Sequence, residues 1–215
     1  FGRLDGITIG IDPGHQQYAD QTLEPLAPGS DRSKEKMSAG AKGIKTDTPE
    51  YEINLAVANK LYPLLQNVGA TVIMTRMENL VTMSNMERAL YMNGNHVDFW
   101  IRIHCNFSIA SSNIGASVLT PKSVTAPEKD ARSKKLATYV LNEFCRTTGA
   151  KPLSVDESEI QTGFNWSQSP VIAVEMGFLS NATEDVRLCK DSYQNACAAG
   201  IFNGVIDYCK DTGEQ

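Results

Sequence analysis

The chain has 215 residues, of which 41% are hydrophobic and 21% charged, an ordinary composition for a globular protein of one domain. No apolar run is long enough to span a bilayer. The formal net charge is -5, and lysine and arginine are scattered along the chain, which argues against a nucleic-acid-binding surface. We therefore expect a single domain over residues 1–215, with its core at about 7–209, no membrane span and no nucleic-acid partner.

The first predicted element is a short strand, residues 7–11, in which β-branched residues alternate with small ones. An Asp12-Pro-Gly turn ends this strand, and His15 follows directly. Ligands of open α/β sheets gather beyond the carboxyl ends of the strands, so His15 is a candidate metal ligand or proton carrier. The polar stretch 16–47 shows little periodicity and is predicted to be a loop. A loop this long suits either a groove wall or lid, or a tolerated surface insertion.

A helix is predicted next, with Thr48 as its N-cap, Pro49 in its first position and Gly69 as its end. Pro63 should kink the helix or end its ideal hydrogen bonding, because proline lacks an N–H and crowds the preceding turn. Apolar residues recur at helical spacing on one face, which should be buried. These residues are Ile53, Val57, Leu61, Leu64 and Val68. A strand at 70–75 completes a β-loop-α-β unit.

Glu50 lies in the first turn of this helix. A carboxylate there is often no more than a partner of the helix dipole, worth about 0.3–1 kcal/mol. In a β-loop-α-β unit, however, the helix starts on the side where the preceding strand ends, which brings Glu50 towards His15. This proximity to a histidine at a strand end favours a role as a metal ligand.

The residues from Ser84 to Glu87 have the sequence of a capping box. They predict a short helix that Asn93-Gly94 terminates. His96 then lies in a polar turn away from any strand end, so we expect it to be a surface histidine.

A third strand, 99–103, places Trp100, Arg102 and His104 on one face, because side chains alternate along a strand. It ends in His104-Cys-Asn106, which puts a second histidine at a strand end. Another strand is predicted at 115–119.

The last third of the chain predicts a helix from Pro127 to Gly149, a loop-like stretch at 154–166 and a strand at 171–174 that leads into Glu175. A final helical region is predicted at about 183–209. The inward-facing residues expected on these helices are Ala131, Leu136, Val140 and Phe144, then Leu188, Tyr193, Cys197, Ile201, Val205 and Tyr208. Strands and helices alternate, which is typical of an α/β sheet covered on both sides.

The five cysteines form no CxxC pair and no metal-knuckle spacing. We expect buried structural thiols, of which the odd count leaves at least one free or intermolecular. A Cys189–Cys197 bridge is an alternative. Cys105, beside His104, is an alternative metal ligand.

Two histidines and a carboxylate are a typical set of protein ligands for a catalytic zinc ion, whose fourth position is left for water. His15, Glu50 and His104 fit this set. Zinc lowers the pKa of bound water to about 7 and polarises a carbonyl oxygen. A second carboxylate is then needed to carry the proton to the leaving nitrogen, and Glu175 fits that role.

Spacing leaves alternatives open for the other charged residues. Asp12 could compete as a ligand, although Asp-Pro-Gly is a common turn in which the aspartate binds its own backbone. Arg76 and Arg102 both lie near strand ends. Each could bind a substrate carboxylate or pair with Asp12 or Glu50.

Six sequence blocks stand in a fixed order between about Thr8 and Cys209. They are Ile9-Gly-Ile-Asp-Pro-Gly-His15, Glu50-Tyr-Glu-Ile-Asn-Leu55, Val72-Ile-Met-Thr-Arg76, Glu87-Arg-Ala89, Ile103-His-Cys-Asn106 and Val174-Glu-Met-Gly-Phe-Leu-Ser-Asn181. This series resembles the zinc-dependent N-acetylmuramoyl-L-alanine amidases of the family often called amidase-3. The stretches 24–43 and 164–167 are most similar to the clostridial and spore-forming branch of that family.

The resemblance implies that His15, Glu50 and His104 bind one Zn²⁺ per chain, and that Glu175 activates the zinc-bound water. Glu50 is implied rather than Glu52, because the family's glutamate stands four residues before the asparagine of an Asn-Leu pair. Cys105 replaces an alanine of the family motif, which could make the site oxidisable.

Asn106 and Asn181 match positions that the family tends to keep. Together with Arg76 and Arg102, they are candidates for substrate binding.

The resemblance also implies a single α/β domain with a mixed, mostly parallel sheet of about six strands and helices on both faces. The implied reaction is hydrolysis of the amide between N-acetylmuramic acid and L-alanine in peptidoglycan or muropeptides. This substrate implies a place outside the cytoplasmic membrane, in the cell wall or secreted, and an activating protein partner is a possibility. The alternatives are another zinc peptidase or deacetylase of the cell wall, and a non-catalytic peptidoglycan-binding module.

Overall fold

A six-stranded sheet forms the centre of the computed structural model, which describes residues 3–123 and 126–213. The strand order is β4-β1-β5-β8-β6-β7, and all neighbours are parallel except β6 and β8. The strands are β1 (Thr8–Pro13), β4 (Thr71–Met74), β5 (Phe99–Asn106), β6 (Ala116–Pro121), β7 (Pro152–Ser158) and β8 (Val171–Phe178). The predicted mixed, mostly parallel sheet is confirmed. Positions 1–2 and 214–215 of the predicted domain lie outside the described residues.

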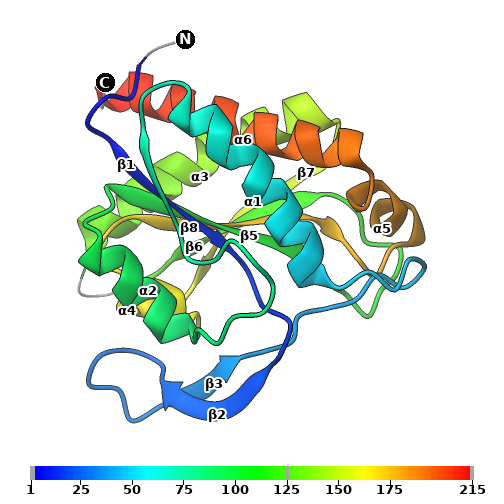
Figure 1. Cartoon of the computed structure of the whole chain (residues 1–215), viewed down its shortest axis with the longest axis horizontal. Helices are drawn as coiled ribbons and strands as arrows, with labels where there is room; N and C mark the ends of the chain where they lie inside the picture. The colour runs from blue at the N-terminus through cyan, green and yellow to red at the C-terminus, as the bar shows by residue number, and fades with distance from the viewer. Residues whose placement is uncertain (1–2, 124–125, 214–215) are drawn as a thin grey trace.

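Helices cover both faces of this sheet (Figure 1). The helices are α1 (Glu50–Gln66), α2 (Asn85–Gly94), α3 (Pro127–Thr148), α4 (Thr162–Trp166), α5 (Ala182–Leu188) and α6 (Asp191–Thr212). One face carries α1, α3 and α6, and the other carries α2 and α4. Within the described residues, no helix is long and apolar enough to cross a membrane.

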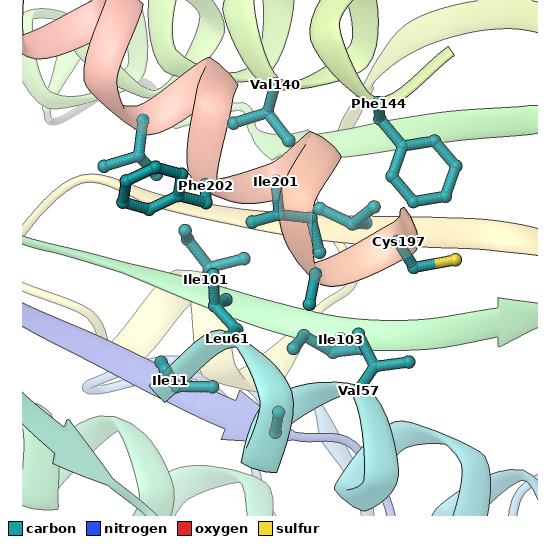
Figure 2. Close-up of a cluster of buried hydrophobic side chains, with 14 of the residues drawn as sticks. Ile11, Val57, Leu61, Ile101, Ile103, Val140, Phe144, Cys197, Ile201 and Phe202 are labelled. Atoms are coloured by element: carbon teal, nitrogen blue, oxygen red, sulfur yellow. The ribbon is translucent and has the colours of Figure 1, made fainter. Parts of the chain in front are cut away.

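The larger core lies between the sheet and the layer formed by α1, α3 and α6, as Figure 2 shows. Ile11, Ile101 and Ile103 of the strands meet side chains from all three helices, which include Val57, Leu61, Val140, Phe144, Ile201 and Phe202. All of these side chains are buried. Burying each such side chain contributes roughly 1.5–3 kcal/mol, so this layer holds the strands, and therefore their carboxyl ends, in place.

Two segments that were predicted as loops contain regular structure. Within 16–47, β2 (Asp20–Pro25) pairs antiparallel with β3 (Ser33–Met37) to form a hairpin. Within 154–166 lie most of β7 and the five-residue helix α4. Both predictions were wrong because these elements are short: β2, β3 and β7 are mostly exposed, and the buried α4 has only five residues, too few to show the hydrophobic periodicity that marks longer elements.

Several helix details also differ from prediction. Helix α1 begins at Glu50, with Pro49 rather than Thr48 as its N-cap, and it continues past Pro63 to Gln66. On α3, Ala131 is exposed and Ser133 is buried instead. The final helical region consists of α5 and α6, which the extended backbone of Lys190 separates. The capping box of Ser84 and Glu87, by contrast, is confirmed at the start of α2.

The cysteines are free thiols, so the alternative Cys189–Cys197 bridge is not formed. Cys197 is fully buried in the larger core. The Sγ of Cys189 instead lies 3.5 Å from Thr46 Oγ1.

A buried ion network joins the end of β1 to two neighbouring elements. Asp12 accepts hydrogen bonds from Arg88 Nη1 of α2 at 2.6 Å and from Arg102 Nε of β5 at 2.8 Å. The Thr75 hydroxyl donates to Asp12 as well, at 2.6 Å. Burial alone would raise the pKa of Asp12, but the charges of Arg88 and Arg102 outweigh it and hold that pKa well below its usual range.

We predict that Asp12→Asn lowers the free energy of unfolding at pH 7 by about 3–5 kcal/mol, because it leaves two arginines in the interior without their counter-charge. The folded-state pKa of Asp12 lies below its unfolded value of about 3.9. The stabilisation is therefore present above that pH and is lost as the pH falls below it. Urea unfolding at several pH values measures both effects.

The control is Asp20→Asn, which alters a half-exposed carboxylate of β2 and should change the unfolding free energy by less than about 1 kcal/mol. Equal unfolding midpoints for Asp12→Asn and the unsubstituted protein at pH 7 would contradict the prediction.

Candidate active site

Three side chains converge at the carboxyl edge of the sheet, namely His15 after β1, Glu50 at the start of α1 and His104 near the end of β5. Their possible ligand atoms all lie within 4.8 Å of one another. His15 Nε2 lies 3.3 Å from Glu50 Oε2, and His104 Nδ1 lies 3.1 Å from Glu50 Oε1. These are the three ligands that the sequence predicts, and the fold brings them together.

The sheet topology explains the position of the two histidines. Strands β1 and β5 are parallel neighbours, with Pro13 opposite Ile103. Both strands therefore end at the same edge of the sheet, where the rings of His15 and His104 lie with their centroids 4.8 Å apart.

Backbone groups orient the carboxylate of Glu50. The Ala41 N–H donates to Oε2 at 2.9 Å, and the Cys105 N–H donates to Oε1 at 3.0 Å. The Glu50 N–H in turn donates to the Ala41 carbonyl. The first turn of α1 is thus held from two directions, and the carboxylate has little freedom to turn away from the histidines.

His15 has a left-handed backbone, with φ of 59°, a conformation that is uncommon for residues other than glycine. Its Nδ1 lies 3.0 Å from the Ser38 carbonyl and 3.2 Å from the Ser38 hydroxyl, which leaves Nε2 facing Glu50. A second hydrogen bond of this kind orients the ring in known metal sites.

The charges of the group suit a metal ion. Burial, together with the charges of His15 and Arg102, lowers the pKa of His104 to about 4. Burial opposes ionisation of Glu50, but the hydrogen bonds with His104 and His15 outweigh it and hold the pKa of Glu50 well below its usual range. At neutral pH the structure therefore holds a neutral His104 and an ionised Glu50, the forms that ligate metals.

Glu175 of β8 stands directly opposite His104 in the strand register. Its Oε2 is buried and has no hydrogen-bond partner among the described residues. Burial, and then the charge of Glu50, raises the pKa of Glu175 to about 8, although Arg102 acts in the opposite direction. A half-buried carboxyl group with one buried, unpartnered oxygen, beside a candidate metal group, is typical of a catalytic acid or base.

All four of these side chains line one cavity of about 260 Å³. Other residues that line it include Lys34, Ser38, Arg102, Asn106 and Gln161. The site is therefore a polar cleft at the carboxyl edge of the sheet, where open α/β sheets bind their ligands.

Residues 9–207 match the Amidase_3 family, which is described as N-acetylmuramoyl-L-alanine amidase. The chain belongs to this family. Among its relatives is the N-acetylmuramoyl-L-alanine amidase LytC of Bacillus subtilis, 27% identical over 203 residues, which cover 94% of this chain and 36% of LytC. The chain thus spans only part of the length of that relative.

Solved structures share the fold. Ami1 of Mycobacterium smegmatis, an N-acetylmuramyl-L-alanine amidase, matches with a TM-score of 0.89 at 18% identity, over 98% of this chain and 100% of Ami1. The CwlD amidase of Clostridioides difficile, solved in complex with the GerS lipoprotein, matches with a TM-score of 0.76 at 24% identity. The match covers 96% of this chain and 100% of that chain. The resemblance to amidases that include those of clostridia and spore formers is confirmed.

The four residues suggested for substrate binding occupy different places in this amidase. Arg102 and Asn106 line the cavity, whereas Arg76 and Asn181 are not among its lining residues. The guanidinium of Arg76 donates to the carbonyls of Pro13, Gly14, Tyr51 and Glu78 and to the Asn79 side chain. The side chain of Asn181 caps α5 by accepting from the Thr183 and Glu184 N–H groups.

The two alternative ligands have other roles in the amidase. Asp12 is engaged by Arg88 and Arg102. The thiol of Cys105 lies 3.7 Å from Asn54 Oδ1, and burial raises its pKa well above the usual value, which disfavours the thiolate that a metal needs. His96, predicted at the surface, is exposed.

Sequence reasoning missed Arg88 and Lys34. Arg88 is fully buried and donates from Nη2 to the His15 carbonyl and to Gln16 Oε1. Its place in the sequence block Glu87-Arg-Ala89 was the available signal. Lys34 had no such signal, because it lies in the weakly patterned segment 16–47.

We predict that Gly14→Ala abolishes the metal binding expected of the His15-Glu50-His104 group. A Cβ at Gly14 would overlap the imidazole ring of His104, so the ring would have to leave the group. Zinc stoichiometry, measured on purified protein by elemental analysis, tests the loss.

Gly94→Ala is the matched control, since a Cβ there meets no described atom within 4 Å. This variant should bind zinc like the unsubstituted protein. Full zinc occupancy in Gly14→Ala would contradict the packing argument.

Proposed function

We propose that this amidase hydrolyses the amide bond between the lactyl group of N-acetylmuramic acid and L-alanine in peptidoglycan, and that it does so with zinc. The observation that carries the proposal is the convergence of His15, Glu50 and His104 in one cavity beside Glu175, whose buried Oε2 has no hydrogen-bond partner among the described residues. Family membership supports the choice of bond.

The donor set fits zinc. Two histidines and one carboxylate leave one tetrahedral position open, and the pKa values of His104 and Glu50 favour their ligating forms. His15 and Glu50 are each oriented by a second contact. When bound, zinc would polarise the scissile carbonyl and lower the pKa of a water molecule to about 7.

Glu175 is proposed as the group that moves the proton. It takes a proton from the attacking water as the water oxygen bonds to the carbonyl carbon. It then gives that proton to the leaving nitrogen of L-alanine as the carbon–nitrogen bond breaks. A raised pKa favours both transfers, because the group must accept and release a proton near neutral pH. A cation bound by Glu50 would neutralise its charge and so lower the pKa of Glu175 from about 8. The ionised form of Glu175, which can accept a proton from water, would then be favoured before the reaction begins.

Arg102 and Asn106, which line the same cavity, are proposed to contact the substrate. A place outside the cytoplasmic membrane is proposed because peptidoglycan lies there. An activating protein partner is also proposed, since the related CwlD amidase was solved in complex with the GerS lipoprotein.

The bond and the metal can be tested together. We expect purified muropeptides incubated with the zinc-loaded protein to release stem peptide with a new L-alanine amino terminus, detected by mass spectrometry. A chelator should abolish release, and added zinc should restore it. Cleavage within the stem peptide, or loss of an acetyl group, would instead support the peptidase or deacetylase alternative.

Glu175→Gln tests the proposed proton carrier. It should lower kcat by about 10²- to 10⁴-fold while zinc stoichiometry stays at the unsubstituted value. Glu157→Gln, which alters an exposed carboxylate of β7, is the control and should keep full activity. Normal turnover by Glu175→Gln would exclude this role for Glu175.

A further inference from the structure

Two cationic side chains, Lys34 of β3 and Arg102 of β5, lie at the candidate active site. Both line the cavity that contains His15, Glu50, His104 and Glu175. Both also line an adjoining cavity of about 170 Å³, which shares His15, Ser38, His104 and Gln161 with the first. The two cations therefore lie beside the candidate metal group.

Both cations keep unused hydrogen-bond donors. The Lys34 ammonium donates to the Ile160 carbonyl at 2.9 Å, which uses one of its three N–H groups. Arg102 donates from Nε to Asp12 and from Nη2 to Asn85 Oδ1 at 2.7 Å. Among the residues that the structure describes, Nη1 of Arg102 has no hydrogen-bond partner.

Existing contacts orient the two cations to different degrees. The bond to Ile160 ties Lys34 to the segment before α4. The side chain of Arg102 is only 4% exposed and is fixed on Asp12. Arg102 therefore loses little conformational freedom when a ligand binds, whereas Lys34 is an exposed residue of β3 that one hydrogen bond orients.

The positive charges are only partly compensated. Burial and the charge of Arg102 lower the pKa of Lys34, which indicates that the two cations repel each other. Asp12 is shared with Arg88, and Glu35 lines only the adjoining cavity. Within the described residues, Glu50 and Glu175 line the first cavity with the two cations but accept no hydrogen bond from either. An anion bound between Lys34 and Arg102 would relieve this repulsion and accept the unused donors.

We propose that Lys34 and Arg102 form a binding site for a free carboxylate of the stem peptide, an inference that rests on the proposed function. In the substrate, the carboxyl of N-acetylmuramic acid is consumed in the scissile amide, and the sugar offers neutral hydroxyl and acetamido groups. Carboxylates are found only on the peptide side. The pair thus recognises the leaving peptide and selects carboxylate over carboxamide there.

The test compares two muropeptides that differ only at the second residue of the stem, which ends in a carboxylate or in a carboxamide. The unsubstituted enzyme should show a KM about tenfold lower for the carboxylate substrate, since a hydrogen bond to a charged group strengthens binding by about a factor of ten. Lys34→Met, which keeps the apolar stem and removes the charge, should reduce this preference about tenfold, through KM rather than kcat.

Lys36→Met is the matched control. Lys36 lies two residues along the same strand and lines a different cavity, near Asp20. This variant should keep the preference of the unsubstituted enzyme. Equal KM values for the two substrates in the unsubstituted enzyme, or an equal loss on both in Lys34→Met, would overturn the proposal.

Binding separates this inference from the proposed function. Isothermal titration of both muropeptides into zinc-loaded Glu175→Gln should give a Kd about tenfold lower for the carboxylate form. If the unsubstituted enzyme cleaves neither substrate, the proposed function fails, and the two Kd values still decide the carboxylate site. Equal Kd values overturn the site whether or not cleavage occurs.

Discussion

The buried carboxylate of Asp12 is the interaction on which the rest of the structure depends. It lies at the end of β1 between Arg88 of α2 and Arg102 of β5, so that a single negative charge joins two strands and a helix. Charges in the interior must have partners, because no water solvates them there. Arg88 also donates to the His15 carbonyl. The network that holds these elements together therefore fixes the backbone of the first candidate ligand as well.

Close packing completes the site around this network. Gly14 allows the backbone to pass directly against the His104 ring, and a Cβ at Gly40 would lie 2.9 Å from Glu50 Oε2 and from the His15 ring. Backbone N–H groups of Ala41 and Cys105 hold the Glu50 carboxylate. The three candidate ligands are thus confined before any ion binds, which reduces the entropy lost on binding.

The β2–β3 hairpin contacts α4 and the segment before it, although they are far apart in sequence, and Lys34 and Gln161 from these two regions line the cleft. Asn165 Nδ2 donates to the Leu26 carbonyl, Trp166 Nε1 donates to the Pro25 carbonyl, and Lys34 donates to the Ile160 carbonyl. These contacts bring Lys34 beside Arg102, which β5 supplies from the sheet. The candidate metal group thus depends on two strand ends and the start of α1, and the proposed carboxylate site depends in addition on the β2–β3 hairpin, which supplies Lys34.

The sequence by itself determined the alternation of strands and helices, the burial of their apolar faces and the candidates His15, Glu50, His104 and Glu175. Strand ends and helix starts are local signals, since hydrophobic periodicity and turn residues mark them. Only the tertiary structure decided that Arg76 and Asn181 bind the fold itself while Arg102 lines the cleft, and that Lys34 joins Arg102 there. The partners of a charged side chain depend on which distant segments pack against it, and the polar, half-exposed segments that supply them carry no periodic pattern.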